Sequence, residues 1–319
     1  MSERTDRLHR KLETELGPVV RNALADAEVV EVDINPDGQI WVDRHGVDLA
    51  MIGVMGPQVV MSLICTVAAM SDRVVTPTAP ILEATLPDGS RFHATIPPIT
   101  TAPAIAIRKH LSQALTLDDY VRQGVMTREQ CERLRRAVAH RENIIVAGGT
   151  GSGKTTLTNA LIEEIGRVNP GHRLLILEDT PEIVCHNPNR VAKRTTVEVD
   201  MRGLVRSSLR MNPDRIIVGE VRGGEAEALI RAWNTGHPGG VATLHCSSAH
   251  AALGKLEEYV ADAVAGDKRR GIAEAVDLVA FIERAANRRV LSELLLVKGF
   301  ANDDYLTEVI SKENVHVVA

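Results

Sequence analysis

Alternation of apolar and polar residues predicts strands in the first third of the chain. Two pairs of alternating segments are each joined by a turn sequence, 35–38 or 87–89, and the four segments are 30–34, 39–42, 82–86 and 91–96. A polar, charged helix is predicted over residues 1–26, and a further strand near 104–107. The pattern therefore predicts an α+β domain over residues 1–109.

The pattern changes after a connector predicted over residues 110–127. Thr127 and Gln130 have the spacing of a capping box, which predicts a helix from there to about His140. Beyond it, apolar runs separated by helical stretches predict strands at 143–147, 174–177, 216–218 and 241–244, with closing strands at 278–282 and 290–297. Strands that alternate with helices are typical of a mostly parallel sheet. Residues 128–319 are therefore predicted to form an α/β domain.

One uncharged stretch, from Leu49 to Met70, is long enough to cross a bilayer. Its glycines and polar residues argue against a transmembrane helix. The Gly56-Pro57 break instead predicts a buried helix of soluble length that begins near Pro57.

Composition describes an ordinary globular protein of about two domains, with 319 residues, 44% hydrophobic and 25% charged. The formal net charge is −5 and aromatic residues make up 3% of the chain, so no sequence-specific or non-specific nucleic-acid binding is expected. Four cysteines without C-x-x-C spacing disfavour a disulfide framework or a zinc ribbon, and they suit a reducing cytoplasm.

The strongest local signal is a phosphate-binding loop. The segment from Gly148 to Thr155 fits G-x-x-x-x-G-K-[ST], follows a predicted buried strand and opens a predicted helix. We expect ATP to contact the loop and the start of the helix, at Gly148, Gly149, Thr150, Gly151, Ser152, Gly153, Lys154, Thr155 and Thr156. Lys154 would reach the β- and γ-phosphates, and the Thr155 hydroxyl would hold Mg²⁺.

Two carboxylates lie at predicted strand ends, where ligands bind in an open α/β sheet. Glu178 ends one strand, and Glu220 ends the next. The aspartate that P-loop enzymes usually carry on this second strand is missing, since Gly219 precedes Glu220. We therefore expect Glu220 to polarise water, to contact Mg²⁺ through water, or both. The alternative for each acid is a solvated strand end.

Two histidines follow, His237 in a glycine-rich turn and His245 at the end of the next predicted strand. Either imidazole could hydrogen-bond a γ-phosphate or transmit its loss to a neighbour. Spacing alone favours a structural role for both.

Together these segments resemble the four sequence boxes of type II/IV secretion ATPases, in particular conjugal transfer ATPases of the TrbB type. The boxes lie at 148–155, 176–180, 212–223 and 235–245, and the N-terminal segments 80–84, 88–91 and 107–109 are also similar. The resemblance implies a RecA-like ATPase domain. It also implies that Glu178 belongs to the Asp box, that Glu220 is the Walker B glutamate, and that His237 and His245 belong to the His box. We therefore predict catalytic roles for Glu178, Glu220 and His245, and nucleotide binding for His237.

The resemblance further implies a cytoplasmic homohexameric ring, peripherally associated with the inner membrane, that couples ATP hydrolysis to DNA or protein transfer and pilus assembly. Inner-membrane channel and coupling proteins would be its partners. Nucleotide would lie between the two domains, within reach of an arginine. The candidates are Arg91, Arg108, Arg206, Arg210 and Arg222, of which Arg108 is the one we predict to act in catalysis.

Three alternatives remain at this point. A type IV pilus or type II secretion ATPase belongs to the same superfamily, but no four-cysteine zinc insertion is present. A RecA-like nucleic-acid motor would need more basic and aromatic surface. A ring subunit that binds nucleotide without hydrolysing it would have no need of both Glu178 and Glu220. The basic segment 268–270 is expected to be a solvated face, or else a contact with anionic lipid or a partner.

Overall fold

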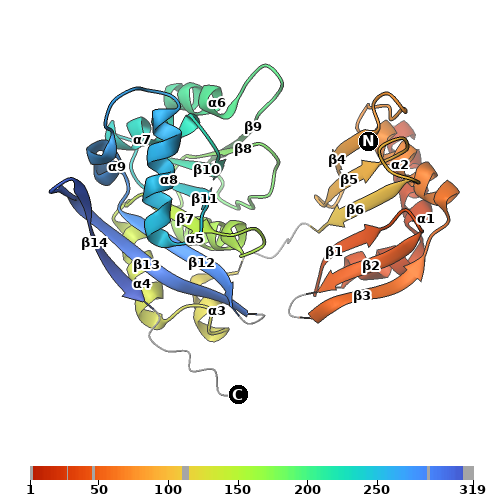
Figure 1. Ribbon diagram of the computed structural model, residues 1–319, viewed down its shortest axis with the longest axis horizontal. Helices are drawn as coiled ribbons and strands as arrows, with labels where there is room; N and C mark the ends of the chain where they lie inside the picture. The colour runs from red at the N-terminus through yellow and green to blue at the C-terminus, as the bar shows by residue number, and fades with distance from the viewer. Residues whose placement is uncertain (1–2, 27, 45–46, 110–114, 286–287, 312–319) are drawn as a thin grey trace. The chain divides into compact units, whose positions relative to one another are not determined.

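The computed structural model describes residues 3–26, 28–44, 47–109, 115–285 and 288–311 (Figure 1). The chain divides into two compact units, which we call the first unit (Met1–Leu111) and the second unit (Ser112–Ala319). Each unit has hydrophobic core residues of its own.

The first unit is an antiparallel sheet with two helices packed on one face. The strand order is β3-β2-β1-β6-β5-β4. The strands are β1 (Val29–Ile34), β2 (Gln39–Arg44), β3 (Val47–Val54), β4 (Ile81–Thr85), β5 (Arg91–Thr95) and β6 (Ala104–Arg108). Helices α1 (Glu3–Ala25) and α2 (Pro57–Met70) cover the face that carries Val32, Val42 and Phe92. The predicted α+β class and both predicted hairpins are confirmed.

The uncharged stretch from Leu49 to Met70 divides between β3 and α2. α2 begins at Pro57, as predicted, and buries Val60, Leu63 and Ile64. β3 was not predicted, because it lies at the edge of the sheet and its apolar residues are mostly exposed. Among the residues that the structure describes, no helix is long and apolar enough to cross a membrane.

The second unit contains an eight-stranded mixed sheet of order β14-β13-β12-β7-β11-β10-β8-β9. Six strands are parallel: β7 (Ile144–Gly148), β8 (Leu174–Glu178), β9 (Arg190–Arg194), β10 (Arg215–Val221), β11 (Val241–His245) and β12 (Leu278–Ala285). The antiparallel strands β13 (Arg288–Ala301) and β14 (Asp304–Ser311) complete it. The predicted mostly parallel sheet is thus confirmed, although β9 and β14 were not predicted.

Helices cover both faces of this sheet, so its central strands are apolar on both sides. Along β7, Ile145 and Ala147 belong to one core and Ile144 and Val146 to the other. The helices are α3 (Leu117–Arg122), α4 (Arg128–Ala139), α5 (Lys154–Val168), α6 (Met201–Ser208), α7 (Glu225–Asn234), α8 (Ala249–Ala261) and α9 (Arg269–Ala275), with a 3-10 turn at Leu209–Met211.

Part of the predicted connector is folded into the second unit. Residues 110–114 lie outside the described residues, but 117–122 form α3, whose Leu117 and Tyr120 are buried. The predicted capping box is confirmed, because the Thr127 hydroxyl accepts from the Gln130 amide and the Gln130 side chain accepts from the Thr127 amide. α3 was missed because six residues are too few for a clear helical period.

Candidate functional site

The phosphate-binding loop joins the end of β7 to the start of α5. A Cβ atom built on Gly148 would lie 2.1 Å from the carbonyl oxygen of Ile282 on the neighbouring β12, so only glycine fits there. Gly153 has φ of 102°, in the left-handed region, and immediately precedes the first residue of α5. The loop therefore presents backbone amides at the positive end of a helix, an arrangement that binds phosphates.

Lys154 is buried against this loop. Its Nζ donates to the carbonyl oxygens of Gly148 (3.0 Å) and Gly149 (2.7 Å) and lies 3.4 Å from Nδ1 of His245. The Ser152 hydroxyl is buried and makes no hydrogen bond within the described part of the chain. A cradle of amides, a buried cation and an unpartnered hydroxyl fit the phosphates of a nucleotide.

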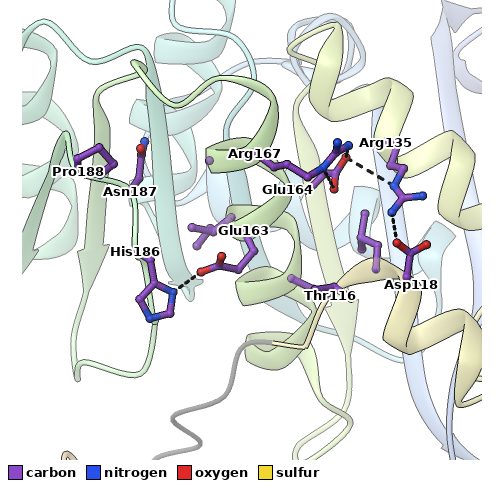
Figure 2. Close-up of a pocket in the computed structure, with 13 residues that line it drawn as sticks. Thr116, Asp118, Arg135, Glu163, Glu164, Arg167, His186, Asn187 and Pro188 are labelled. Carbon is purple, nitrogen blue, oxygen red and sulfur yellow. Dashed lines mark hydrogen bonds and ion pairs between the residues drawn. The ribbon is translucent and has the colours of Figure 1, made fainter.

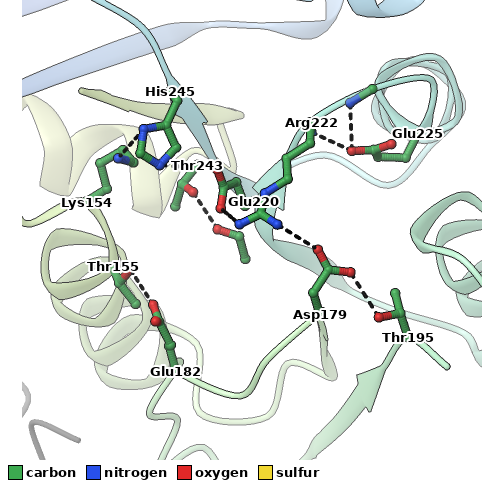
Figure 3. A network of polar contacts seen from close by, with 12 residues as sticks. Lys154, Thr155, Asp179, Glu182, Thr195, Glu220, Arg222, Glu225, Thr243 and His245 are labelled. Atoms are coloured by element: carbon green, nitrogen blue, oxygen red, sulfur yellow. Dashed lines mark hydrogen bonds and ion pairs between the residues drawn. The ribbon is translucent and has the colours of Figure 1, made fainter. Parts of the chain in front are cut away.

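The carboxyl ends of four neighbouring parallel strands meet at this edge of the sheet. Gly148 and His245 are register partners on β7 and β11, and Glu220 is the penultimate residue of β10. Figure 3 shows Lys154, His245 and Glu220 in a row across the strand ends. The structure thus brings together three predicted site residues that lie up to 91 positions apart in sequence.

Both oxygens of the Glu220 carboxylate are engaged. Oε1 lies 3.2 Å from Nε2 of His245, and Oε2 accepts from Nη2 of Arg222 at 2.5 Å. Arg222 also forms an ion pair with Asp179 (3.6 Å), and Asp179 accepts a hydrogen bond from the Thr195 hydroxyl (3.0 Å) (Figure 3). The Glu220 side chain is therefore held in one orientation by two partners, His245 at the end of β11 and Arg222 just after β10.

His245 is placed between a cation and a carboxylate. Burial lowers its pKa, the positive charge of Lys154 lowers it further, and Glu220 opposes both. Together these effects favour the neutral imidazole. We assign the proton to Nε2, which faces Glu220, because Nδ1 faces the Lys154 ammonium and must accept.

Glu178 lies at the end of β8 and is buried. Its Oε1 accepts from the amides of Glu182 and Ile183, both at 2.8 Å, and so shapes the turn that follows the strand. A Cβ on Gly219 would lie 2.9 Å from Cγ of Glu178, which explains glycine where an aspartate was expected.

The carboxylate beside the predicted magnesium ligand is Glu182, which sequence reasoning missed. The Thr155 hydroxyl donates to its Oε2 at 3.1 Å (Figure 3). The only sequence signal was an acid four residues after Glu178, and the position of that acid depends on the turn that Glu178 holds.

The structure does not bring His237 to the phosphate loop of the same chain, and its contact with the nucleotide stays a prediction. His237 precedes β11 and His245 ends it, so the two lie at opposite ends of a strand that is roughly 16 Å long. Instead, the turn after His237 is fixed by Asn143, whose Oδ1 accepts from the amides of Gly239 (2.7 Å) and Gly240 (3.0 Å).

The candidate arginines lie in several places. Arg108 ends β6 of the first unit, opposite Glu31 of β1 and Arg91 of β5, and is exposed. Arg206 and Arg210 are exposed on α6 and the turn that follows it. Arg222 is the candidate that belongs to the network around Glu220. The catalytic role of Arg108 stays a prediction.

A separate cavity of about 550 Å³ lies beside α5, between α3, α4 and residues 186–188 (Figure 2). Arg135 bridges Asp118 (2.7 Å) and Glu164 (3.6 Å), and Arg167 bonds Glu164 as well (2.5 Å). None of the described residues that line this cavity belongs to the phosphate loop. Its ion pairs hold α3, α4 and α5 together.

The chain is similar to known proteins over nearly its whole length. The family model described as "Type II/IV secretion system protein" matches residues 13–290. The chain is 46% identical over 303 residues to conjugal transfer protein TrbB of Rhizobium radiobacter, covering 95% of this chain and 94% of that protein. It is 30% identical over 331 residues to type IV secretion system protein VirB11 of Bartonella henselae, covering 88% and 91%.

Among solved structures, the Legionella pneumophila ATPase DotB has a similar fold, with a TM-score of 0.66 at 21% identity over 92% of this chain and 79% of that one.

Proposed function

We propose, because the chain belongs to the type II/IV secretion system protein family, that it is the ATP-hydrolysing motor of a conjugative type IV secretion system. The observation that carries the chemical part is the meeting of the phosphate loop, Glu220 and His245 at one edge of the sheet. The similarity to TrbB supports conjugative transfer of DNA or protein and pilus assembly as the process that it drives.

We propose a RecA-like P-loop ATPase domain for residues 128–319, preceded by an N-terminal α+β domain. The phosphate-loop strand β7 is interior to a mostly parallel sheet, and β11 separates it from β10, the strand that carries Glu220. The likeness to DotB supports the fold alone.

Nucleotide binding is assigned to the loop and the first turn of α5. The amides of residues 148–156 would surround the phosphates, with Lys154 as the cation beside them. Thr155 would hold Mg²⁺, and Glu182, whose carboxylate accepts from the Thr155 hydroxyl, would contact that ion directly or through water. Bound Mg²⁺ supplies neutralisation of the phosphate charge during phosphoryl transfer.

Glu220 is the group that we assign to the attacking water. Its carboxylate is fixed on one side by His245 and on the other by Arg222, so it can accept a hydrogen bond from water in a constant direction. Glu178 acts indirectly, through the turn that carries Glu182, and is a positioning residue.

Substituting the two carboxylates should separate their roles. Glu220→Gln is expected to lower ATP turnover at least about 100-fold while ADP binding stays within twofold, because it removes the water-polarising charge and spares the loop.

Glu182→Gln is expected to raise the Mg²⁺ concentration needed for half-maximal turnover several-fold, because it removes a negative charge beside Thr155. Steady-state ATPase assays across a Mg²⁺ titration measure the turnover of Glu220→Gln and the Mg²⁺ requirement of Glu182→Gln.

Glu258→Gln, an exposed change on α8, serves as the control for the loss of one acid. Full turnover in Glu220→Gln would remove Glu220 from the mechanism. A Mg²⁺ response of Glu182→Gln that matches the unsubstituted protein would remove Glu182 from the metal site.

We further propose a homohexameric ring at the cytoplasmic side of the inner membrane, with channel and coupling proteins as partners and Arg108 reaching nucleotide from another domain or subunit. Turnover per subunit should then rise with protein concentration as the light-scattering mass reaches six subunits, and Arg108→Ala should lose turnover at that same mass. Full activity from a monomer would contradict the shared site.

A further inference from the structure

Arginines gather where β12 and β13 meet. Arg284 of β12 is the register partner of Arg289 of β13, and Ala285 is the partner of Arg288. Like charges directly across an antiparallel pair repel and destabilise the ladder. Strand pairing alone therefore does not account for arginine at these positions.

Arg289 lies directly against the phosphate loop. A Cβ atom built on Gly153 would be 3.0 Å from Cδ of Arg289 and 3.2 Å from its Nε. Ile282 of β12 also reaches the loop, with its Cδ1 3.6 Å from the same Cβ position. All of these residues belong to the second unit, so the contact lies within one compact body.

The strand order places Arg289 on the side of the loop that the proposed site leaves unassigned. β12 neighbours β7 on one side, and β11 neighbours it on the other, followed by β10. His245 and Glu220 approach from the β11 and β10 side. Arg289, from the β12–β13 pair, approaches from the opposite side.

The surroundings of Arg289 suit an anion. Lys154 follows Gly153 directly, and the positive amino end of α5 begins at the same point. Lys154 and Arg289 thus bring two positive charges to the same glycine, at the positive end of α5. This concentration of positive charge attracts a diphosphate or triphosphate that enters the loop.

We propose that Arg289 binds the phosphate chain of the nucleotide as a second cation, from the β12–β13 side of the loop. The inference rests on the proposed nucleotide binding and adds a residue to it. Unlike Arg108, Arg289 belongs to the same compact unit as the loop, so its contribution to binding does not require a second domain or subunit.

Three substitutions on the hairpin test the proposal. Arg289→Met keeps length and apolar contact but removes the charge, Arg289→Lys keeps the charge, and Arg288→Met removes the neighbouring exposed arginine. Binding of a fluorescent ADP analogue, and its displacement by inorganic pyrophosphate, would be measured for the full chain, together with thermal unfolding without nucleotide.

Arg289→Met is expected to raise the Kd for ADP and for pyrophosphate by about tenfold, since a charge-assisted contact is worth roughly 1.5 kcal/mol. Arg289→Lys should stay within about threefold and Arg288→Met within about twofold, at unchanged unfolding temperature.

Wild-type affinity of Arg289→Met for ADP, or a loss for ADP without one for pyrophosphate, would overturn the phosphate contact. Equal losses in Arg289→Met and Arg289→Lys, accompanied by a lower unfolding temperature, would assign Arg289 to packing instead. Failure of the unsubstituted protein to bind ADP at all would overturn the proposed function, and this inference with it.

Discussion

Lys154→Ala is expected to lower ATP turnover at least about 100-fold, because it removes the cation that would face the transferring phosphate. Lys154 is 8% exposed, and its Nζ is held by two loop carbonyls and lies beside His245. Its charge therefore acts in a site with little water, where electrostatic stabilisation is strong. Turnover of saturating Mg·ATP by the assembled protein measures the effect.

The same substitution has a second consequence at His245. Removing the ammonium removes one of the three causes that lower the His245 pKa, which are burial, Lys154 and Arg222, so the imidazole should titrate closer to its ordinary range. Lys255→Ala, on the exposed surface of α8, is the control for the loss of one lysine. Retention of wild-type turnover by Lys154→Ala would refute the proposed phosphate site.

Arg215→Met is expected to destabilise the second unit by about 3–5 kcal/mol, because it leaves several buried acceptors without a donor and each costs about 1–3 kcal/mol. Arg215 is 1% exposed. Its guanidinium donates to the carbonyl oxygens of Gly239 (3.0 Å) and Val138 (2.8 Å) and to the side chains of Asn169 (2.8 Å) and His172 (3.2 Å). Burial lowers the pKa of Arg215 to about 10, so it remains charged at neutral pH.

Urea unfolding can follow this unit alone, because the chain has two tryptophans, one in each unit. In a Trp41→Phe background, the fluorescence of Trp233 on α7 reports the second unit. Arg206→Met, an exposed arginine on α6, is the matched control and should shift the midpoint little. An unchanged midpoint in Arg215→Met would show that the network contributes no net stability.

Local signals in the sequence were sufficient for much of the second unit. The glycines and Lys154 of the phosphate loop follow a buried apolar run and open an amphipathic helix, so strand, loop and helix could all be predicted from neighbouring residues. The family prediction rested on four such segments and is confirmed by the family model and by the similarity to TrbB.

Features that depend on residues far apart in the sequence were not predicted. The edge strand β3 is exposed and lacks the alternation that marks a half-buried strand. The predicted strand at 241–244 already lay between His237 and His245, but only the sheet showed that His245 is the one beside the phosphate loop. The sequence around Arg215 did not indicate a buried network, because the groups that accept its hydrogen bonds come from the ends of other helices and strands.

The sequence by itself determined that this chain has a nucleotide loop, acids and a histidine at strand ends, and a place in a secretion family, because each is encoded by contiguous residues. Only the tertiary structure decided which side chains meet. Strand order placed His245 beside Lys154, the turn held by Glu178 carried Glu182 to Thr155, and the β12–β13 pair brought Arg289 to Gly153. Such pairings depend on how strands far apart in the chain align, which no local pattern specifies.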